Sequence, residues 1–508
     1  MAGAIALLGT TACNDLLDIE QHGVLNYDTY YQTDEEAETA ATAMYVNIRS
    51  MEYYKLLCIN LLSDDFWAGG GGRNDNAELE QLNEFTYNTD MSYVEGMFTT
   101  YYTIIYKANV ILGHVPEETD VQKRVHAEAR AIRAWAYFDL ITLWGNPPLV
   151  DHELAPSEYT RENGSTEKLW ELFNTDLQTA IDSGYLPEKS SVNDQSTWRV
   201  TKQFAQAMYG KGLLWQKNYK EASKQLQAVI DSHLYELYQG PYEDINAYTT
   251  KMNCESMFES VRIDDRNNVF DNFDMVHLMT HWRTDKMTIS SEFSSLGWGF
   301  CTPQKALYDA FVAEEGEDGY RLNGTMKTFE QMQALGNTIN AGSSIISEGY
   351  FMWKNRVFAE QTPAEGYNYT SLHNPKWMRY AEVLLLAAEA YLEDGENAKA
   401  ADCLNQIRTR AKLAPKSNIT LKDIQIEKRL ELCGEMCRYQ DMVRWGIAEE
   451  LLKEQGKYTP FLDSNGQVTY QAFNTDSSKY GFKSRHNLLP YPGTEVRLNS
   501  AIVQNTGW

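Results

Sequence analysis

The sequence predicts a mostly α-helical fold, built on tetratricopeptide-like helix pairs, with a large irregular, loop-rich insert that contains a few short strands. Helical periodicity runs through both ends of the 508-residue chain, but it breaks down between about residues 235 and 375. Two helix pairs, one on each side of that break, share a pattern of small and leucine-like side chains. These observations favour one helical scaffold interrupted by an insert.

The chain begins with a short apolar segment that ends in small residues directly before Cys13, in "GTTACND". Such a segment is typical of the apolar region and cleavage site of a signal peptide. It also resembles the bacterial motif that places lipid on a cysteine, although Thr10 stands where that motif prefers leucine. The alternative is an N-terminal strand with a buried cysteine. We expect residues 1–12 to be a signal-peptide remnant and residues 13–508 to form a single unit.

The N-terminal part, residues 13–234, is predicted to be helical. Three- and four-residue spacing of apolar side chains predicts helices at about 35–54, 92–113, 120–144, 166–183 and 201–216. Residues 60–90 interrupt this pattern with the glycine-rich, polar run "DDFWAGGGGRNDN". A long irregular segment within an ordered protein is usually functional, so we expect a binding loop there.

The two helix pairs lie near residues 209–232 and 377–411. In both, small residues on the first helix allow close approach of alanine and leucine-like residues on the second, which is the tetratricopeptide pattern. The matching positions are Gly212, Ala222, Leu226 and Val229 in one pair, and Ala390, Ala400, Leu404 and Ile407 in the other.

The rest of the chain divides into three parts. Residues 235–375 mix glycine, asparagine, serine and aromatic residues with short apolar runs, which predicts loops and a few strands around a helix near 303–314. Residues 376–452 return to helical periodicity, with further helices near 421–435 and 437–452. Residues 453–508 form a C-terminal tail, in which "DSNGQ" resembles the start of a calcium loop but lacks its distal glutamate, so a turn is expected.

Charge and cysteine content exclude several classes of function. With 45 basic and 71 acidic residues, the formal net charge is −26, which argues against a nucleic-acid partner. The seven cysteines have irregular spacing. Cys433 and Cys437 are four residues apart, but no histidine pair accompanies them, so buried free thiols are expected rather than a zinc site or a disulfide framework. We predict neither a metal nor a cofactor.

Several segments, in the same order along the chain, resemble the RagB/SusD family of outer-membrane nutrient-binding lipoproteins of Bacteroidetes. They include the start "CNDLLDIE", the helices "YYTIIYKANVIL", "AEARAIRAWAYFDLITLWGNPPLV" and "RYAEVLLLAAEAYLEDG", and the tail "LLPYPGTEVRLNSAIVQNTGW". The segment "EKRLELCGEMCRYQDMVRWG" also fits, except that Cys433 and Met436 stand where the family often has an aromatic residue and a glycine. The resemblance spans nearly the whole chain.

The resemblance implies a non-enzymatic, surface-exposed lipoprotein of the outer membrane, lipidated at Cys13. Such a protein captures an oligosaccharide or polysaccharide and delivers it to a SusC-like TonB-dependent transporter. Four tetratricopeptide-like units would form its scaffold, and the loop-rich part would carry the ligand site. Alternatives are a peptide or glycopeptide ligand in the same family, a surface glycoside hydrolase, or a scaffold that holds only proteins.

Sugar binding requires aromatic planes for C–H faces and polar side chains for hydroxyl groups. The loop after the first helix offers Asp65, Trp67, Arg73 and Asn76 beside four glycines, and the family resemblance makes Trp67 the candidate platform. The insert offers Trp282, Arg283 and Trp298. For each tryptophan the alternative is packing against the scaffold.

Catalytic interpretations find no supporting motif. Asp64 and Asp65 are adjacent and would point apart on an extended loop, whereas a glycosidase needs two carboxylates about 5–9.5 Å apart. The run "GGGGR" lacks the lysine and hydroxyl residue of a phosphate-binding loop.

Overall fold

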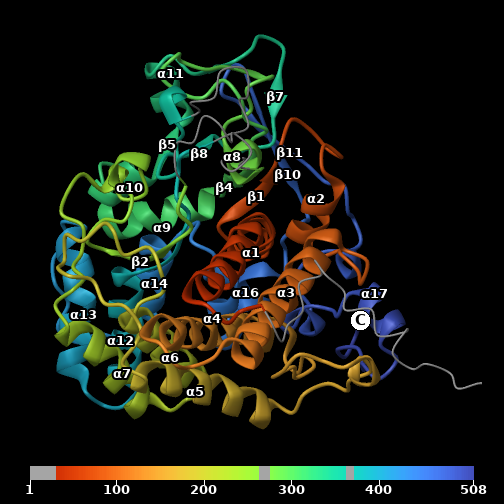
Figure 1. The fold of residues 1–508 in the computed structure, drawn as a ribbon. Helices are drawn as coiled ribbons and strands as arrows, with labels where there is room; N and C mark the ends of the chain where they lie inside the picture. The colour runs from red at the N-terminus through yellow and green to blue at the C-terminus, as the bar shows by residue number, and fades with distance from the viewer. Residues whose placement is uncertain (1–29, 263–274, 362–370) are drawn as a thin grey trace, which may run out of the picture.

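The computed structural model describes residues 30–262, 275–361 and 371–508. Residues 1–12 and Cys13, to which the sequence assigns cleavage and lipidation, lie outside the described residues. The architecture is mostly helical, with short strands, as predicted (Figure 1). Within the described ranges, no helix is both long enough and apolar enough to cross a membrane.

Four of the helices predicted in the N-terminal part lie within about one residue of the predicted bounds, but the first extends to Leu61 rather than residue 54, and a short helix at Ala77–Glu84 lies within the stretch predicted as an irregular loop. This part contains α1 (Asp34–Leu61), β1 (Phe66–Gly69), α2 (Ala77–Glu84), α3 (Ser92–His114), α4 (Asp120–Trp144), α5 (Thr166–Asp182), α6 (Lys202–Trp215) and α7 (Tyr219–Asp231). Side-chain caps fix several starts: Thr33 and Thr119 each form a capping box that satisfies free backbone N–H groups.

The middle part has more regular structure than the sequence suggests, but in short pieces. Its strands are β2 (Ser256–Glu259), β3 (Met287–Thr288), β4 (Phe300–Pro303), β5 (Met326–Thr328), β6 (Thr338–Ile339), β7 (Ser344–Ile345) and β8 (Tyr350–Met352). Its helices are α8 (Met275–Thr280), α9 (Lys305–Glu315), α10 (Tyr320–Thr325) and α11 (Phe329–Ala334). Elements of six residues or fewer carry too little periodicity to be recognised in a sequence.

The C-terminal part contains β9 (Lys376–Arg379), α12 (Tyr380–Glu393), α13 (Asn397–Arg410), α14 (Leu421–Glu431), α15 (Arg438–Arg444), α16 (Ala448–Leu452), β10 (Thr459–Asp463), β11 (Val468–Gln471) and α17 (Gly493–Leu498). The helix predicted at 437–452 is divided, because Gly446 adopts a positive φ of 70° between α15 and α16.

The helices pack as antiparallel neighbours, while the strands form small sheets. Direct contacts join α3 to α4, α4 to α5, α6 to α7, and α12 to both α7 and α13. The strands pair as β1–β4, β2–β9, β3–β6, β5–β8 and β11–β10–β7. Elements α8, α11, β5, β7 and β8 gather with the β10–β11 hairpin at one end of the molecule, and the helix pairs lie at the other (Figure 1).

Small residues allow the close helix packing that the sequence predicts, with one change of partner. Gly210, rather than Gly212, faces the second helix of its pair: a Cβ there would lie 2.6 Å from Leu226 Cγ. Gly212 instead receives the ring of Phe173 from α5, whose Cε1 atom would lie 2.1 Å from a Cβ. The two glycines therefore pack α6 against both of its neighbours.

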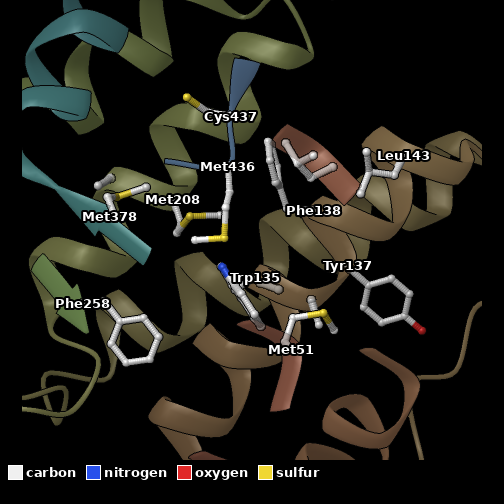
Figure 2. Close-up of a cluster of buried hydrophobic side chains, with 14 of the residues drawn as sticks. Met51, Trp135, Tyr137, Phe138, Leu143, Met208, Phe258, Met378, Met436 and Cys437 are labelled. Carbon is white, nitrogen blue, oxygen red and sulfur yellow. The ribbon is translucent and has the colours of Figure 1, made fainter. Parts of the chain in front are cut away.

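A single large hydrophobic core unites the N- and C-terminal helices. Figure 2 shows Met51 of α1, Trp135 of α4, Met208 of α6, Phe258 of β2 and Met378 of β9 converging in it. Five of the described cysteines are buried free thiols and Cys254 is partly buried, in agreement with the sequence interpretation: Cys58, Cys301, Cys403, Cys433 and Cys437. A second, smaller core holds the strands of the middle part together.

A buried charge cluster links the scaffold helices to the middle part. Its cations are Arg321, Lys354, Arg379 and Arg410, and its anions are Glu255, Glu315, Glu427, Glu431 and Glu435. Glu431, at the end of α14, lies 2.6 Å from Arg379 and 3.2 Å from Arg321, and it also pairs with Arg410. Burial alone would raise the pKa of Glu431, but these guanidinium charges outweigh it and lower the pKa.

Candidate functional site

Two of the predicted binding segments meet although they are far apart in the sequence. Strand β1 pairs antiparallel with β4, so that Trp67 lies opposite Thr302 and Gly69 opposite Phe300. Just beyond the strands, the Gly70 N–H donates to the Gly299 carbonyl at 2.7 Å. A Cβ at Gly69 would lie 2.3 Å from that same carbonyl oxygen, so only glycine fits. The pairing places the 70–76 loop beside residues 283–299.

Arg283 joins these two segments through its guanidinium group. Its Nη1 donates to Asp75 Oδ2 at 2.5 Å and to the Trp298 carbonyl at 3.0 Å, and it also pairs with Asp285. The guanidinium lies against Gly71, where a Cβ would be only 3.1 Å from it. The interaction fixes a polar surface in which one cation is shared by two carboxylates.

Trp298 presents an exposed ring at this surface. Its side chain is 38% exposed, while its backbone is held on both sides: its N–H donates to Leu278, and that of Gly299 donates to His281, both at 2.8 Å. A rigid backbone with a solvent-facing indole is the geometry that stacks on a ligand, because little further ordering is required.

Trp282 occupies a different environment. It is only 5% exposed and stacks on His281 and, at an interplanar angle of 13°, on Trp353. Its Nε1 donates to the Met352 carbonyl at 3.3 Å. The ring belongs to the core of the middle part and lines a partly open pocket of about 70 Å³. This environment is the one expected of a tryptophan that packs in the protein interior rather than on a ligand.

Asp65 and its neighbour Asp64 fix the start of the loop to the C-terminal helices. The Asp65 Oδ1 accepts from Arg429 Nε at 2.7 Å, and Asp64 accepts from Arg438 Nε at 2.8 Å. Burial raises the pKa of Asp65. Burial also raises the pKa of Asp64, but the positive charges of Arg429 and Arg438 outweigh this effect and lower the pKa to about 2. Both carboxylates are buried, and their contacts fix the loop to α14 and α15.

The remaining candidate residues of the loop are Trp67, Arg73 and Asn76. Asn76 caps α2: its Oδ1 accepts from Leu79 N at 3.2 Å, and its Nδ2 donates to the Tyr93 hydroxyl. Arg73 forms ion pairs with Glu80 and Glu84. Trp67 is partly buried, and its Nε1 has no hydrogen-bond partner within the described part of the chain. The structure thus groups Arg283 with Trp298, and Trp67 with Arg73 in the lining of a small pocket.

Sequence reasoning missed three exposed aromatic residues, one of which, Phe473, contacts Arg73. Tyr458, Tyr470 and Phe473 belong to the β10–β11 hairpin region, which the sequence interpretation treated as a tail. The "DSNGQ" run forms the hairpin turn, where Asp463 accepts from the backbone of Asn465 and Gln467. Aromatic residues on both sides of a predicted turn were the available signal.

Two family models match this chain. One described as the SusD family matches residues 322–508, and one described as starch-binding associating with outer membrane matches residues 60–214. Among curated relatives, the SusD-like protein P2 of Formosa agariphila is 24% identical over 99% of this chain and 97% of its own length. A SusD-like protein of Bacteroides ovatus is also 24% identical, with the same coverage.

Solved structures show the same fold. A laminarin-binding SusD-like protein is 25% identical with a TM-score of 0.77, covering 94% of this chain and 100% of that one. Surface glycan-binding protein A from Bacteroides thetaiotaomicron, in complex with laminarihexaose, is 23% identical with a TM-score of 0.74, covering 93% and 100%. The chain has the fold of these SusD-like proteins. The chain is a member of the RagB/SusD family.

Proposed function

We propose that this protein is a cell-surface lipoprotein that captures an oligosaccharide or polysaccharide and delivers it to a SusC-like TonB-dependent transporter of the outer membrane. The observation that carries the glycan-binding part is the exposed Trp298 ring on a rigid backbone beside the Arg283–Asp75 ion pair. The family membership and the names of its relatives support the same ligand class.

The chemistry of this surface suits a neutral sugar. The apolar C–H face of a pyranose ring covers the Trp298 indole, while its hydroxyl groups donate to Asp75 and Asp285 and accept from Arg283. Because both carboxylates are paired with Arg283, the surface offers hydrogen bonds rather than a free acid and base. We therefore propose binding without catalysis.

Calorimetric titration with glycans tests this proposal. Laminarihexaose is the first probe, because two of the similar structures are described with laminarin or laminarihexaose; starch, xylan and mannan fragments complete the panel. We expect binding of at least one glycan and release of no reducing ends on incubation. Trp298→Ala should weaken that binding, whereas Tyr159→Ala, which removes a 63% exposed ring elsewhere, should not. Absence of binding across the panel, or production of new reducing ends, would contradict the proposal.

A groove on the opposite, helical side is the proposed transporter-docking surface. The docking groove, of about 630 Å³, lies between α3, residues 148–161 and α17, with Tyr106, Tyr159 and Leu498 in its lining. Leu498 is 82% exposed, and exposed apolar clusters mark protein interfaces.

The charges of the docking groove indicate the chemistry of the partner surface that would bind there. Glu495 in its wall lies near Glu95, and burial first, then this second carboxylate, raises the pKa of Glu495. Arg161, a cation in the same lining, is already paired with Glu158. The complementary partner is a transporter segment with an apolar side chain next to a basic one. Co-purification from mild detergent should recover the transporter with the wild type, and Leu498→Asp should abolish it while glycan binding persists. Recovery of free monomer alone from the wild type would contradict delivery.

A further inference from the structure

A second exposed aromatic surface adjoins the 70–76 loop through Arg73. It consists of Phe473, which is 42% exposed, and Tyr458, which is 45% exposed and lines a small pocket together with Arg73. The two residues flank the β10–β11 hairpin. Tyr470, on the strand face of Leu462 and Val468, donates its hydroxyl to Glu348 at 2.7 Å and is not part of this surface. Large exposed aromatic side chains favour burial against a ligand or partner.

Phe473 is held in place by the loop itself. The Arg73 guanidinium lies 4.8 Å from the centroid of the Phe473 ring, a cation–π contact that supports one face of the ring. Arg73 is in turn paired with Glu80 at 3.0 Å and with Glu84. The neighbouring Asn474 donates to Glu84 Oε2 at 3.2 Å. Because Phe473 remains 42% exposed, the ring is ordered and still open to solvent.

The 70–76 loop contacts both aromatic surfaces. Gly71 and Asp75, on either side of Arg73 in the sequence, contact Arg283, which donates to the Trp298 carbonyl. Arg73 itself contacts Phe473. Between the two surfaces lie charged side chains suited to sugar hydroxyl groups.

We propose that Phe473, supported by Arg73, forms a second subsite for the same glycan chain that Trp298 binds. This inference rests on the proposed glycan-binding function. Trp298 stacks on one sugar ring, the chain crosses the 70–76 loop, and Phe473 stacks on another ring further along. The ligand is then a chain of several sugars rather than a disaccharide, because two rigid aromatic contacts linked by one ligand gain affinity from each other.

Affinity electrophoresis tests this inference on the intact chain. Wild type, Phe473→Ala and Phe473→Tyr are run in gels containing laminarin, starch, xylan or mannan, and the retarding polysaccharide is then cut into fragments of two, three and six sugars for calorimetry. Phe473→Ala should weaken binding of the hexasaccharide by about tenfold, which corresponds to ~1.4 kcal/mol, and leave the disaccharide unchanged. Phe473→Tyr, which keeps the ring, should bind as the wild type does.

The outcomes separate this inference from the function on which it rests. If no polysaccharide retards the wild type, glycan binding itself fails and the second subsite fails with it. If the wild type binds but Phe473→Ala binds the hexasaccharide equally well, the second subsite is refuted and the Trp298 site remains. An equal loss for all fragment lengths also refutes it, since it places both rings on one sugar. The melting temperature of each variant confirms that it is folded.

Discussion

Removal of the Glu431 carboxylate should destabilise the whole protein, because Glu431 is the most connected anion of the buried charge cluster. In Glu431→Ala, Arg321, Arg379 and Arg410 all lose a partner. Truncating one member of a buried ion pair typically costs about 3–5 kcal/mol. Each arginine keeps another carboxylate, for example Glu435 at 2.7 Å from Arg379. We therefore expect the lower end, about 3 kcal/mol.

The assay is urea unfolding combined with thermal melting. Unfolding entropy of roughly 2.1 cal/mol/K per residue gives about 1 kcal/mol/K for a chain of this size, so a 3 kcal/mol loss lowers the melting temperature by about 3 °C. Glu431→Gln keeps the shape and the hydrogen-bond acceptor, and it should cost about half as much. The matched control is Glu396→Ala, which removes an exposed pair with Lys399 and should cost less than about 0.5 kcal/mol.

The reasoning would be refuted if Glu431→Ala and Glu396→Ala lost equal stability. That result would mean that the arginines of the buried charge cluster find other partners without cost. A large loss in Glu431→Gln as well would instead show that the negative charge itself, rather than the hydrogen bonds, holds the cluster together.

Three further expectations concern single residues. Trp282→Ala should cost about 3–5 kcal/mol of stability, as large core truncations do, while Trp298→Ala costs less than about 1 kcal/mol; equal melting temperatures would contradict this. The carboxyl group of Asp64 has a pKa of about 2 in the folded protein and about 4 in the unfolded chain, so its charge stabilises the fold above about pH 4. Stability should therefore fall between about pH 4 and pH 2, and Asp64→Asn should lose less stability across that window. Cys13→Ala, expressed in a native host with a complete signal, should leave the outer-membrane fraction; equal sedimentation of both forms would count against lipidation.

The sequence predicted the scaffold well because helices depend on local spacing. Helices α3, α4 and α5 begin and end within about one residue of their predicted bounds, since capping residues and periodic apolar side chains lie next to each other in the chain. The short strands were missed for the opposite reason: β3 and β6 have two residues each and exist only through their partners.

The candidate site was predicted in part, and the missing part is non-local. Trp282 and Trp298 both stand beside polar residues in the predicted irregular insert, yet one is 5% and the other 38% exposed. Only the pairing of Arg283 with Asp75, 208 residues away, shows which ring faces the loop. Phe473 was overlooked because its partner Arg73 is even more distant in the sequence, and a cation–π contact leaves no periodic pattern.

The pairing of β1 with β4 has a consequence for biogenesis. A chain made and secreted from its N-terminus presents β1 long before its partner exists, and the Arg283–Asp75 contact must close a loop of 208 residues. Contacts of such separation form late in folding. Until then the edge of β1, with its apolar Phe66 and Ala68, is open to pairing with another chain. During export, protection of this segment by a periplasmic chaperone would therefore favour correct folding more than protection of the helix pairs, which close on themselves.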